Sequence, residues 1–151
     1  MLKSARRSWF ALLPTLALAS ALGFACGDPA GTENAGQPCA GPADCYENVN
    51  HDELAGEVVC VDKVEYGYCT HDCESDADCC AVPGECRTDV LQVCSPFENT
   101  SIKRCFLSCE DADLAPGYEG DADRYCSEYM FTGWTCASSG GGSENRKICK
   151  P

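Results

Sequence analysis

The sequence predicts a small disulfide-rich protein, mostly irregular with short β-hairpins, built from three four-cysteine repeats. Three observations lead to this fold class. The chain has 151 residues and 15 cysteines, a density typical of scaffolds held by disulfides in an oxidising compartment. After residue 25 it has no long apolar run, so a conventional core is too thin to offset chain entropy. The cysteines also recur at a fixed spacing, which indicates duplicated modules.

Residues 1–25 have the three parts of a secretory signal peptide. A basic segment is followed by an apolar segment over residues 9–22 and then by small residues at Gly23 and Ala25. The apolar segment is shorter than the about 20 residues of a membrane-spanning helix. We therefore predict that the protein is exported and that residues 1–25 are removed.

Cys26 follows directly on this leader. Residues 22–26, Leu-Gly-Phe-Ala-Cys, resemble the lipobox of bacterial lipoproteins, although Gly23 stands where that family has leucine. The resemblance implies that Cys26 is the lipid-attachment residue, and Gly27 after it implies sorting to the outer membrane. Without Cys26, 14 cysteines remain, the even number that closed disulfides require. The alternative is ordinary cleavage and secretion to the exterior.

The segment after Cys26 is polar and rich in Gly, Ala and Pro. It shows no periodicity, so we expect residues 26–38 to form a lipid-anchored flexible tether, which in extended form reaches about 40 Å. The disulfide-rich domain is then predicted at residues 39–151.

The mature chain is strongly acidic. The formal charge of the whole chain is −13, and removing Lys3, Arg6 and Arg7 with the leader leaves 8 basic against 24 acidic residues, or −16. Such a surface repels nucleic acid and anionic lipid headgroups. We therefore expect no nucleic-acid partner, membrane contact through the lipid anchor, and a protein or glycan partner of unknown identity.

The cysteine spacing divides the domain into units at residues 39–69, 73–105 and 109–149. The first two units share gaps of 5 and then 14 residues between their first three cysteines. Within each unit we predict pairing of the first cysteine with the third and the second with the fourth, plus an extra bridge across the turn between Cys80 and Cys86. The cysteines expected in disulfides are Cys39, Cys45, Cys60, Cys69, Cys73, Cys79, Cys80, Cys86, Cys94, Cys105, Cys109, Cys126, Cys136 and Cys149.

Two resemblances bear on these units. The run Cys69-Thr-His-Asp-Cys73-Glu-Ser-Asp-Ala-Asp-Cys79 resembles uncharacterised bacterial cysteine-rich lipoproteins. The stretch from Cys69 to Cys94, with adjacent cysteines before a Gly-x-Cys, resembles knottins and the N-terminal cysteine-rich domain of Dickkopf proteins. The second resemblance implies an alternative pairing, in which crossed bridges run through Cys79 and Cys80.

Each unit is expected to end in a two-stranded hairpin with one cysteine on each strand. The paired segments are residues 57–61 with 66–70, 90–94 with 102–106, and 133–136 with 146–149. Ser75 and Asp78 form an N-cap pair that predicts a single helical turn. The opening gaps of the units are otherwise expected to be too short for much helix.

Candidate metal ligands occur in two patterns. Asp-Ala-Asp recurs at residues 76–78, 111–113 and 121–123, but no stretch satisfies a calcium-binding loop, so we interpret these residues as turn caps. His71 lies between Cys69 and Cys73. In an oxidising compartment these cysteines are expected to be bridged rather than bound to zinc, with His71 at the surface. We therefore predict no metal and no cofactor.

No catalytic residue is predicted. His51 and His71 lie in acidic, loop-like stretches, and no serine stands in a nucleophile elbow or triad order. Asn99 opens an Asn-Thr-Ser glycosylation acceptor, which is expected to be unmodified in a bacterium. The aromatic side chains are expected to pack over disulfides in a minimal core, with partner binding as the alternative. They are Tyr46, Tyr66, Tyr68, Tyr118, Tyr125, Tyr129 and Trp134.

These observations favour a non-enzymatic lipoprotein of the cell envelope that serves as a structural or binding module. The alternative is a secreted, knottin-like inhibitor or toxin-like protein that acts on a protease or receptor. Such a protein presents a rigid loop, and residues 62–65 and 95–101 are the candidate loops.

Overall fold

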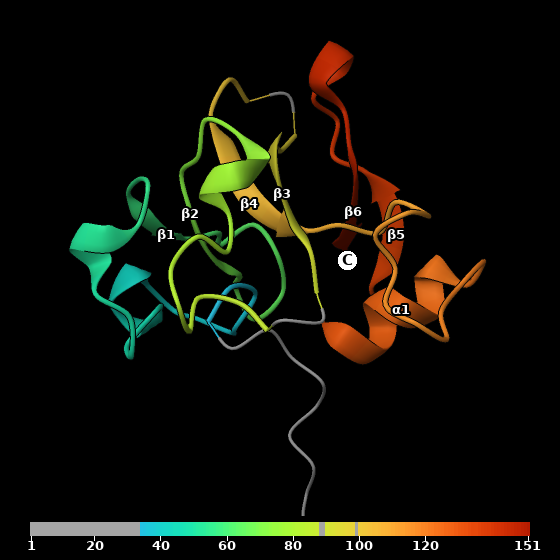
Figure 1. Cartoon of the computed structure of the whole chain (residues 1–151), viewed down its shortest axis with the longest axis horizontal. Helices are drawn as coiled ribbons and strands as arrows, with labels where there is room; N and C mark the ends of the chain where they lie inside the picture. The colour runs from blue at the N-terminus through green and yellow to red at the C-terminus, as the bar shows by residue number, and fades with distance from the viewer. Residues whose placement is uncertain (1–33, 88–89, 99) are drawn as a thin grey trace, which may run out of the picture.

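The computed structural model describes residues 34–87, 90–98 and 100–151 and has the predicted fold class (Figure 1). The described ranges contain three separate two-stranded antiparallel sheets, one α-helix and short 3-10 turns. The strands are β1 (Val58–Cys60), β2 (Cys69–His71), β3 (Gln92–Pro96), β4 (Lys103–Leu107), β5 (Thr135–Ser138) and β6 (Lys147–Lys150). All three predicted hairpins are confirmed, with ends shifted by up to three residues.

In every hairpin the two strand cysteines lie opposite each other but do not bond to each other. Cys60 faces Cys69, and each bonds back to a cysteine in the loop that opens its unit. The other two units follow the same pattern, except that in the third unit one of these partner cysteines, Cys126, lies in the helix that precedes the hairpin. The seven disulfides are Cys39–Cys60, Cys45–Cys69, Cys73–Cys94, Cys79–Cys105, Cys80–Cys86, Cys109–Cys136 and Cys126–Cys149. The predicted pairing is therefore confirmed, and the crossed alternative through Cys79 and Cys80 is wrong.

The opening loops of the first two units form equivalent 3-10 turns, η1 (Pro42–Asp44) and η3 (Asp76–Asp78). In each turn the last aspartate accepts hydrogen bonds from the two backbone N–H groups that precede the turn. For Asp78 the donors are Glu74 and Ser75, with nitrogen–oxygen distances of 2.9 and 2.8 Å. The predicted helical turn is thus confirmed. Two further turns are η2 (His51–Glu53) and η4 (Gly142–Glu144).

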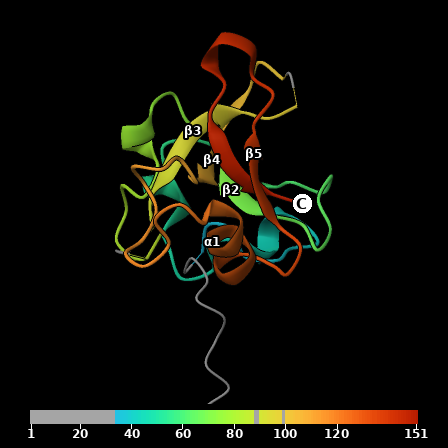
Figure 2. The same cartoon turned by 90° about the vertical axis from the view of Figure 1, so that its right-hand side faces the viewer.

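The third unit departs from the prediction that the opening gaps hold little helix. Its gap contains helix α1 (Ala122–Tyr129), which begins after the N-cap Asp121 and ends before Met130. The gap here is 16 residues long rather than 5, so two turns of helix fit before the hairpin. The buried residues of α1 are Tyr125, Cys126 and Tyr129. The helix contacts β5 and β6, and Figure 2 shows it beside the β5–β6 hairpin.

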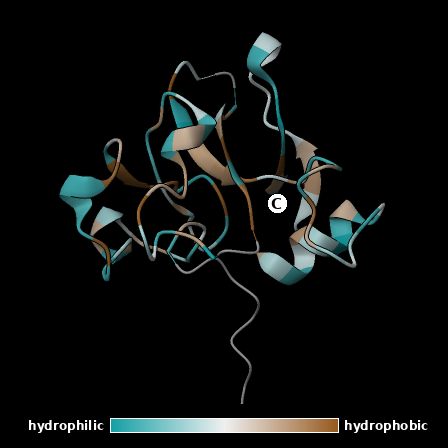
Figure 3. Cartoon of the chain, in the orientation of Figure 1, coloured by the Kyte–Doolittle hydropathy of each residue, from teal (hydrophilic) through white to brown (hydrophobic). Residues whose placement is uncertain are grey.

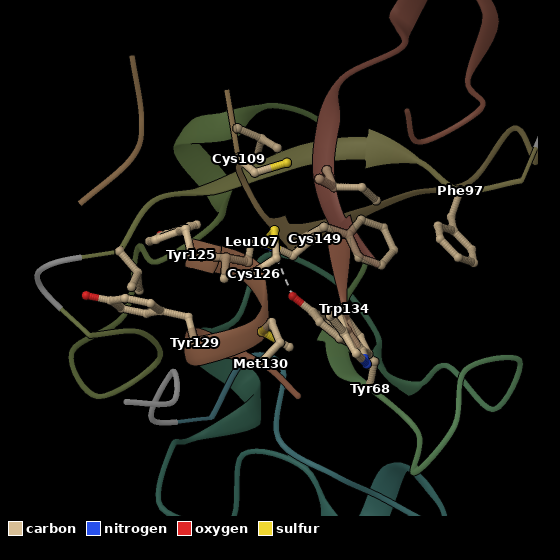
Figure 4. Close-up of a cluster of buried hydrophobic side chains, with 14 of the residues drawn as sticks. Tyr68, Phe97, Leu107, Cys109, Tyr125, Cys126, Tyr129, Met130, Trp134 and Cys149 are labelled. Carbon is tan, nitrogen blue, oxygen red and sulfur yellow. Dashed lines mark hydrogen bonds between the residues drawn. A yellow bond between two sulfur atoms is a disulfide. The ribbon is translucent and has the colours of Figure 1, made fainter. Parts of the chain in front are cut away.

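The main core lies where the three units meet. Figure 4 shows Tyr68 from the first unit beside Trp134 from the third, with their rings stacked at 5.9 Å. Tyr68 also lies 5.3 Å from the ring of Phe106 in the second unit. The strands that enclose this core are the more hydrophobic segments in Figure 3. Tyrosines 46, 68, 125 and 129 and Trp134 are all buried, which confirms for them the expected packing in a minimal core.

Residues 34–38 were expected to belong to the tether, and this boundary needs correction. Ala35 is completely buried, and its backbone N–H donates to the carbonyl of Glu85 at 3.2 Å. Gly36 donates to the carbonyl of Cys69 at 2.8 Å, and Cys69 donates to that of Gln37 at 2.9 Å. The segment is therefore hydrogen-bonded to the domain through its backbone. The rest of the predicted tether lies outside the described residues.

Candidate functional site

The Asp-Ala-Asp carboxylates of the second unit bind the protein's own backbone. Asp78 caps the turn η3, and the hydrogen bonds that it accepts from the backbone of Glu74 and Ser75 lower the pKa of its carboxyl group. One carboxylate oxygen of Asp76 accepts a hydrogen bond from the backbone N–H of Cys94 at 2.8 Å. The other forms an ion pair with the guanidinium of Arg146 at 2.8 Å. Asp78 thus caps its own turn, as the interpretation predicts, whereas Asp76 holds the loop against β3 of the hairpin.

The third unit uses its aspartates in the same way. Asp123 accepts from the backbone N–H of Cys136 at 2.8 Å, the counterpart of the Asp76 contact. Asp121 is the N-cap of α1, and Asp113 accepts from the hydroxyl of Ser108 at 2.6 Å. In the described part of the chain, each group of three or more potential metal ligands that converge includes a cysteine already in a disulfide.

His71 is not at the surface, so that expectation is wrong. Its side chain is fully buried in β2, and so is the side chain of Glu85 beside it. Nε2 of His71 lies 2.8 Å from Oε1 of Glu85, and Nδ1 lies 2.9 Å from the carbonyl oxygen of Asp72. Because both ring nitrogens face acceptor oxygens, this arrangement favours the doubly protonated ring, the imidazolium. The pair is a buried ion pair.

Glu85 reaches His71 because its own loop holds it there. Within the disulfide loop 80–86, the carboxylate accepts from the backbone N–H groups of Cys80 at 2.7 Å and Val82 at 3.0 Å. Burial alone lowers the pKa of His71 and raises that of Glu85. The hydrogen bonds and charges of the pair outweigh burial, so that the net shift raises the pKa of His71 and lowers that of Glu85.

The other candidate catalytic groups also make structural contacts. His51 lies in η2 with Nε2 at 3.1 Å from the carbonyl oxygen of Cys45. The hydroxyl of Ser75 donates to Asp78, and those of Ser138 and Ser139 donate to Asn145 at 2.6 and 3.2 Å. These serines and histidines are therefore not arranged as nucleophile and base.

Tyr66 is the large apolar side chain that the domain displays most. Its side chain is 64% exposed, whereas the other large hydrophobic side chains that are exposed in the described ranges, Leu91 and Ile102, are each about half exposed. Its ring lies 5.7 Å from that of Phe131 in the third unit. The hydroxyl of Tyr66 hydrogen-bonds to Glu65, which raises the pKa of Tyr66. An exposed tyrosine ring with an adjacent carboxylate thus faces solvent and packs on the partly buried Phe131.

The loop that carries Tyr66 is firmly held. The backbone N–H of Cys39 donates to the carbonyl of Tyr66 at 2.9 Å, and that of Gly67 donates to Val64 at 3.0 Å. Gly67 has a φ of +71°, and a Cβ there would lie 2.2 Å from the carbonyl oxygen of Cys39. The disulfide Cys39–Cys60 therefore packs against Gly67, at the end of the predicted candidate loop 62–65 and next to Tyr66.

The second predicted loop, residues 95–101, is less exposed to a partner than the first, because its first three residues are buried. Ser95 and Pro96 belong to β3, and both are buried together with Phe97. The hydroxyl of Ser95 donates to that of Ser139 at 2.8 Å, so this loop packs on the β5–β6 hairpin. Asn99, the predicted glycosylation acceptor, lies outside the described residues, as does Cys26.

Comparisons with known proteins return no relative. No protein-family model, curated protein or solved structure matches the chain. Within the described ranges, no helix has the length and apolar character needed to cross a bilayer.

Proposed function

We propose that the chain is a non-enzymatic lipoprotein of the bacterial outer membrane, anchored through Cys26, whose disulfide-rich domain is a binding module. The observation that carries the anchor is cysteine parity. All 14 described cysteines pair among themselves in seven disulfides. No described cysteine is left to pair with Cys26 within the chain, which supports lipid attachment at that residue.

The use of the polar groups supports binding rather than catalysis. The buried histidine is paired with Glu85, and the carboxylates near the loops cap backbone N–H groups or meet arginines. A catalytic site instead needs acid, base or nucleophile groups free to act on a substrate. The exposed ring of Tyr66, which packs on the partly buried ring of Phe131, is a group of the kind that anchors protein interfaces.

The intact mass of the unreduced protein from its native membrane fraction tests the anchor. Seven closed disulfides lower the mass by about 14 Da relative to the thiol form. We expect residues 26–151, minus that amount, plus acyl chains. A bare mass with one free or capped thiol at Cys26 would overturn the anchor. Cys26→Ser should release the protein from membranes, whereas Ser20→Ala should leave it membrane-bound.

The secreted inhibitor remains the second candidate, because residues 62–66 form an exposed loop with a disulfide at its base. Rigid loops of this kind bind with little loss of conformational entropy. Inhibition of a protease from a panel at micromolar concentration, lost in Tyr66→Ala, would favour this candidate over the envelope module.

A further inference from the structure

We propose that the surface formed by Tyr66, Phe131, Asp62 and Glu65 binds a lysine- or arginine-bearing segment of a partner protein. This inference rests on the proposed binding function and names the chemistry of its partner. We call these four residues the aromatic–acid surface.

The first argument is the backbone of Tyr66. Its φ is +68°, a left-handed conformation that is strained for a bulky residue. Among the described residues, Tyr46 shares this conformation with a φ of 57°, but its side chain is buried and packs in the core. Tyr66 gains no such burial, since 64% of its side chain is exposed. The left-handed backbone at position 66 therefore carries a ring that is mostly exposed to solvent.

The second argument is the position of the ring in the molecule. Tyr66 contacts Phe131, whose ring lies 5.6 Å from that of Trp134, and Trp134 stacks on Tyr68 in the core. The displayed ring thus rests on a fixed series of aromatic rings that joins the first and third units. A preorganised surface of this kind loses little entropy when it binds a partner.

The third argument is charge. Residues 26–151 carry 24 acidic and 8 basic side chains. Five of the described cations are in ion pairs with carboxylates: Lys63, Lys103, Arg104, Arg124 and Arg146. A complementary partner must therefore bring positive charge.

The chemistry of the aromatic–acid surface matches such a partner. Asp62 and Glu65 are exposed on the same loop as Tyr66, whereas Lys63 is ion-paired with Glu98 at 3.4 Å. A guanidinium or ammonium group over an aromatic face is attracted by the ring, and a carboxylate at the ring edge adds a charge-assisted hydrogen bond. Lysine and arginine side chains meet both requirements.

The test measures binding of a fluorescein-labelled peptide, in which lysine alternates with glycine, to the oxidised mature protein by fluorescence anisotropy. We expect saturable binding that Tyr66→Ala weakens about fivefold or more. Tyr66→Phe should keep binding, because the ring remains. Ile102→Ala is the matched control, since it removes an exposed apolar side chain of the second unit.

Tyr66→Gly separates a functional role from a structural one. It relieves the left-handed strain, so the unfolding midpoint should stay the same or rise while peptide binding falls. The proposal is overturned if the peptide does not bind, or if it binds equally to wild type and to both Tyr66→Ala and Tyr66→Gly, which would mark a diffuse acidic surface. The mass of the same preparation reports the anchor separately, so the failure of one proposal does not conceal that of the other.

Discussion

The buried hydroxyl of Tyr68 accepts a hydrogen bond from the backbone N–H of Leu107, with an oxygen–nitrogen distance of 3.0 Å (Figure 4). The same hydroxyl donates to Oε1 of Gln92 at 3.3 Å. One side chain of the first unit thus satisfies a backbone donor and an amide acceptor of the second. The two units share a core for this reason.

Tyr68→Phe should lower the free energy of unfolding by about 1–3 kcal/mol, because it leaves the N–H of Leu107 buried without an acceptor. Tyr46→Phe is the matched control, since the buried hydroxyl of Tyr46 has no hydrogen-bond partner among the described residues. This control substitution should leave the free energy of unfolding unchanged or raise it. Chemical denaturation under non-reducing conditions measures both, and equal losses in the two variants would contradict the role of the Tyr68 hydroxyl.

The ion pair of His71 and Glu85 should give stability a defined dependence on pH. Because the pKa of His71 is raised in the folded state, its protonated ring contributes fully to the free energy of unfolding below about pH 6.5, the ordinary histidine value. This contribution is lost as the pH rises through the folded-state pKa. The lowered pKa of Glu85 means that its contribution is present above about pH 4.3 and is lost as the pH falls through the folded-state pKa. Both contributions are complete between these two pH values.

Glu85→Gln should lower the free energy of unfolding by about 3 kcal/mol inside that window, because it leaves a buried charge without its partner. Unfolding midpoints measured from acid to alkaline pH should show a flatter profile above pH 6.5 than in wild type. His51→Gln, at an exposed histidine, should reproduce the wild-type profile. An unchanged profile in Glu85→Gln would show that another group titrates.

Gly67→Ala should be far more damaging than Gly117→Ala. Both glycines have positive φ, at +71° and +93°. The Cβ of alanine at position 67 would lie 2.2 Å from the carbonyl oxygen of Cys39, whereas at position 117 no atom of the described residues comes within 4 Å of it. Gly117→Ala should cost about 1 kcal/mol for its backbone conformation. Gly67→Ala should cost about 2 kcal/mol more from overpacking, and thermal unfolding without reductant measures the difference.

Arg146 should contribute modestly by joining the second and third units. Its guanidinium contacts Glu110 at 2.7 Å and Asp76 at 2.8 Å, which lowers the pKa of Glu110 and raises that of Arg146. Because these groups are partly exposed, Arg146→Ala should cost about 1 kcal/mol or less, with a smaller loss at high salt. Arg146→Lys should restore only part of the stability that Arg146→Ala loses, since lysine lacks the forked geometry of the guanidinium. Lys147→Ala is the surface control, and an equal loss there would contradict the role of Arg146.

The sequence alone predicted the number of units, the disulfide pairing and the hairpins. These features are local, because the repeated gaps between cysteines and the turn between Cys80 and Cys86 fall within short segments. Helix α1 was missed because the prediction treated all opening gaps alike, although the longer third gap has room for it. Asp121 before Ala122 was the N-cap signal that pointed to this helix.

The burial of His71 and the attachment of residues 34–38 were decided by tertiary structure. His71 stands in an acidic, polar stretch, so its sequence surroundings indicated the surface. Its partner Glu85 comes from a different loop, which also binds Ala35. Which loop covers which strand depends on how the units pack, and packing between distant segments leaves no regular spacing in the sequence. The sequence therefore determined how each unit is closed by its disulfides, whereas the contacts between units decided which polar groups are buried and that Tyr66 remains exposed.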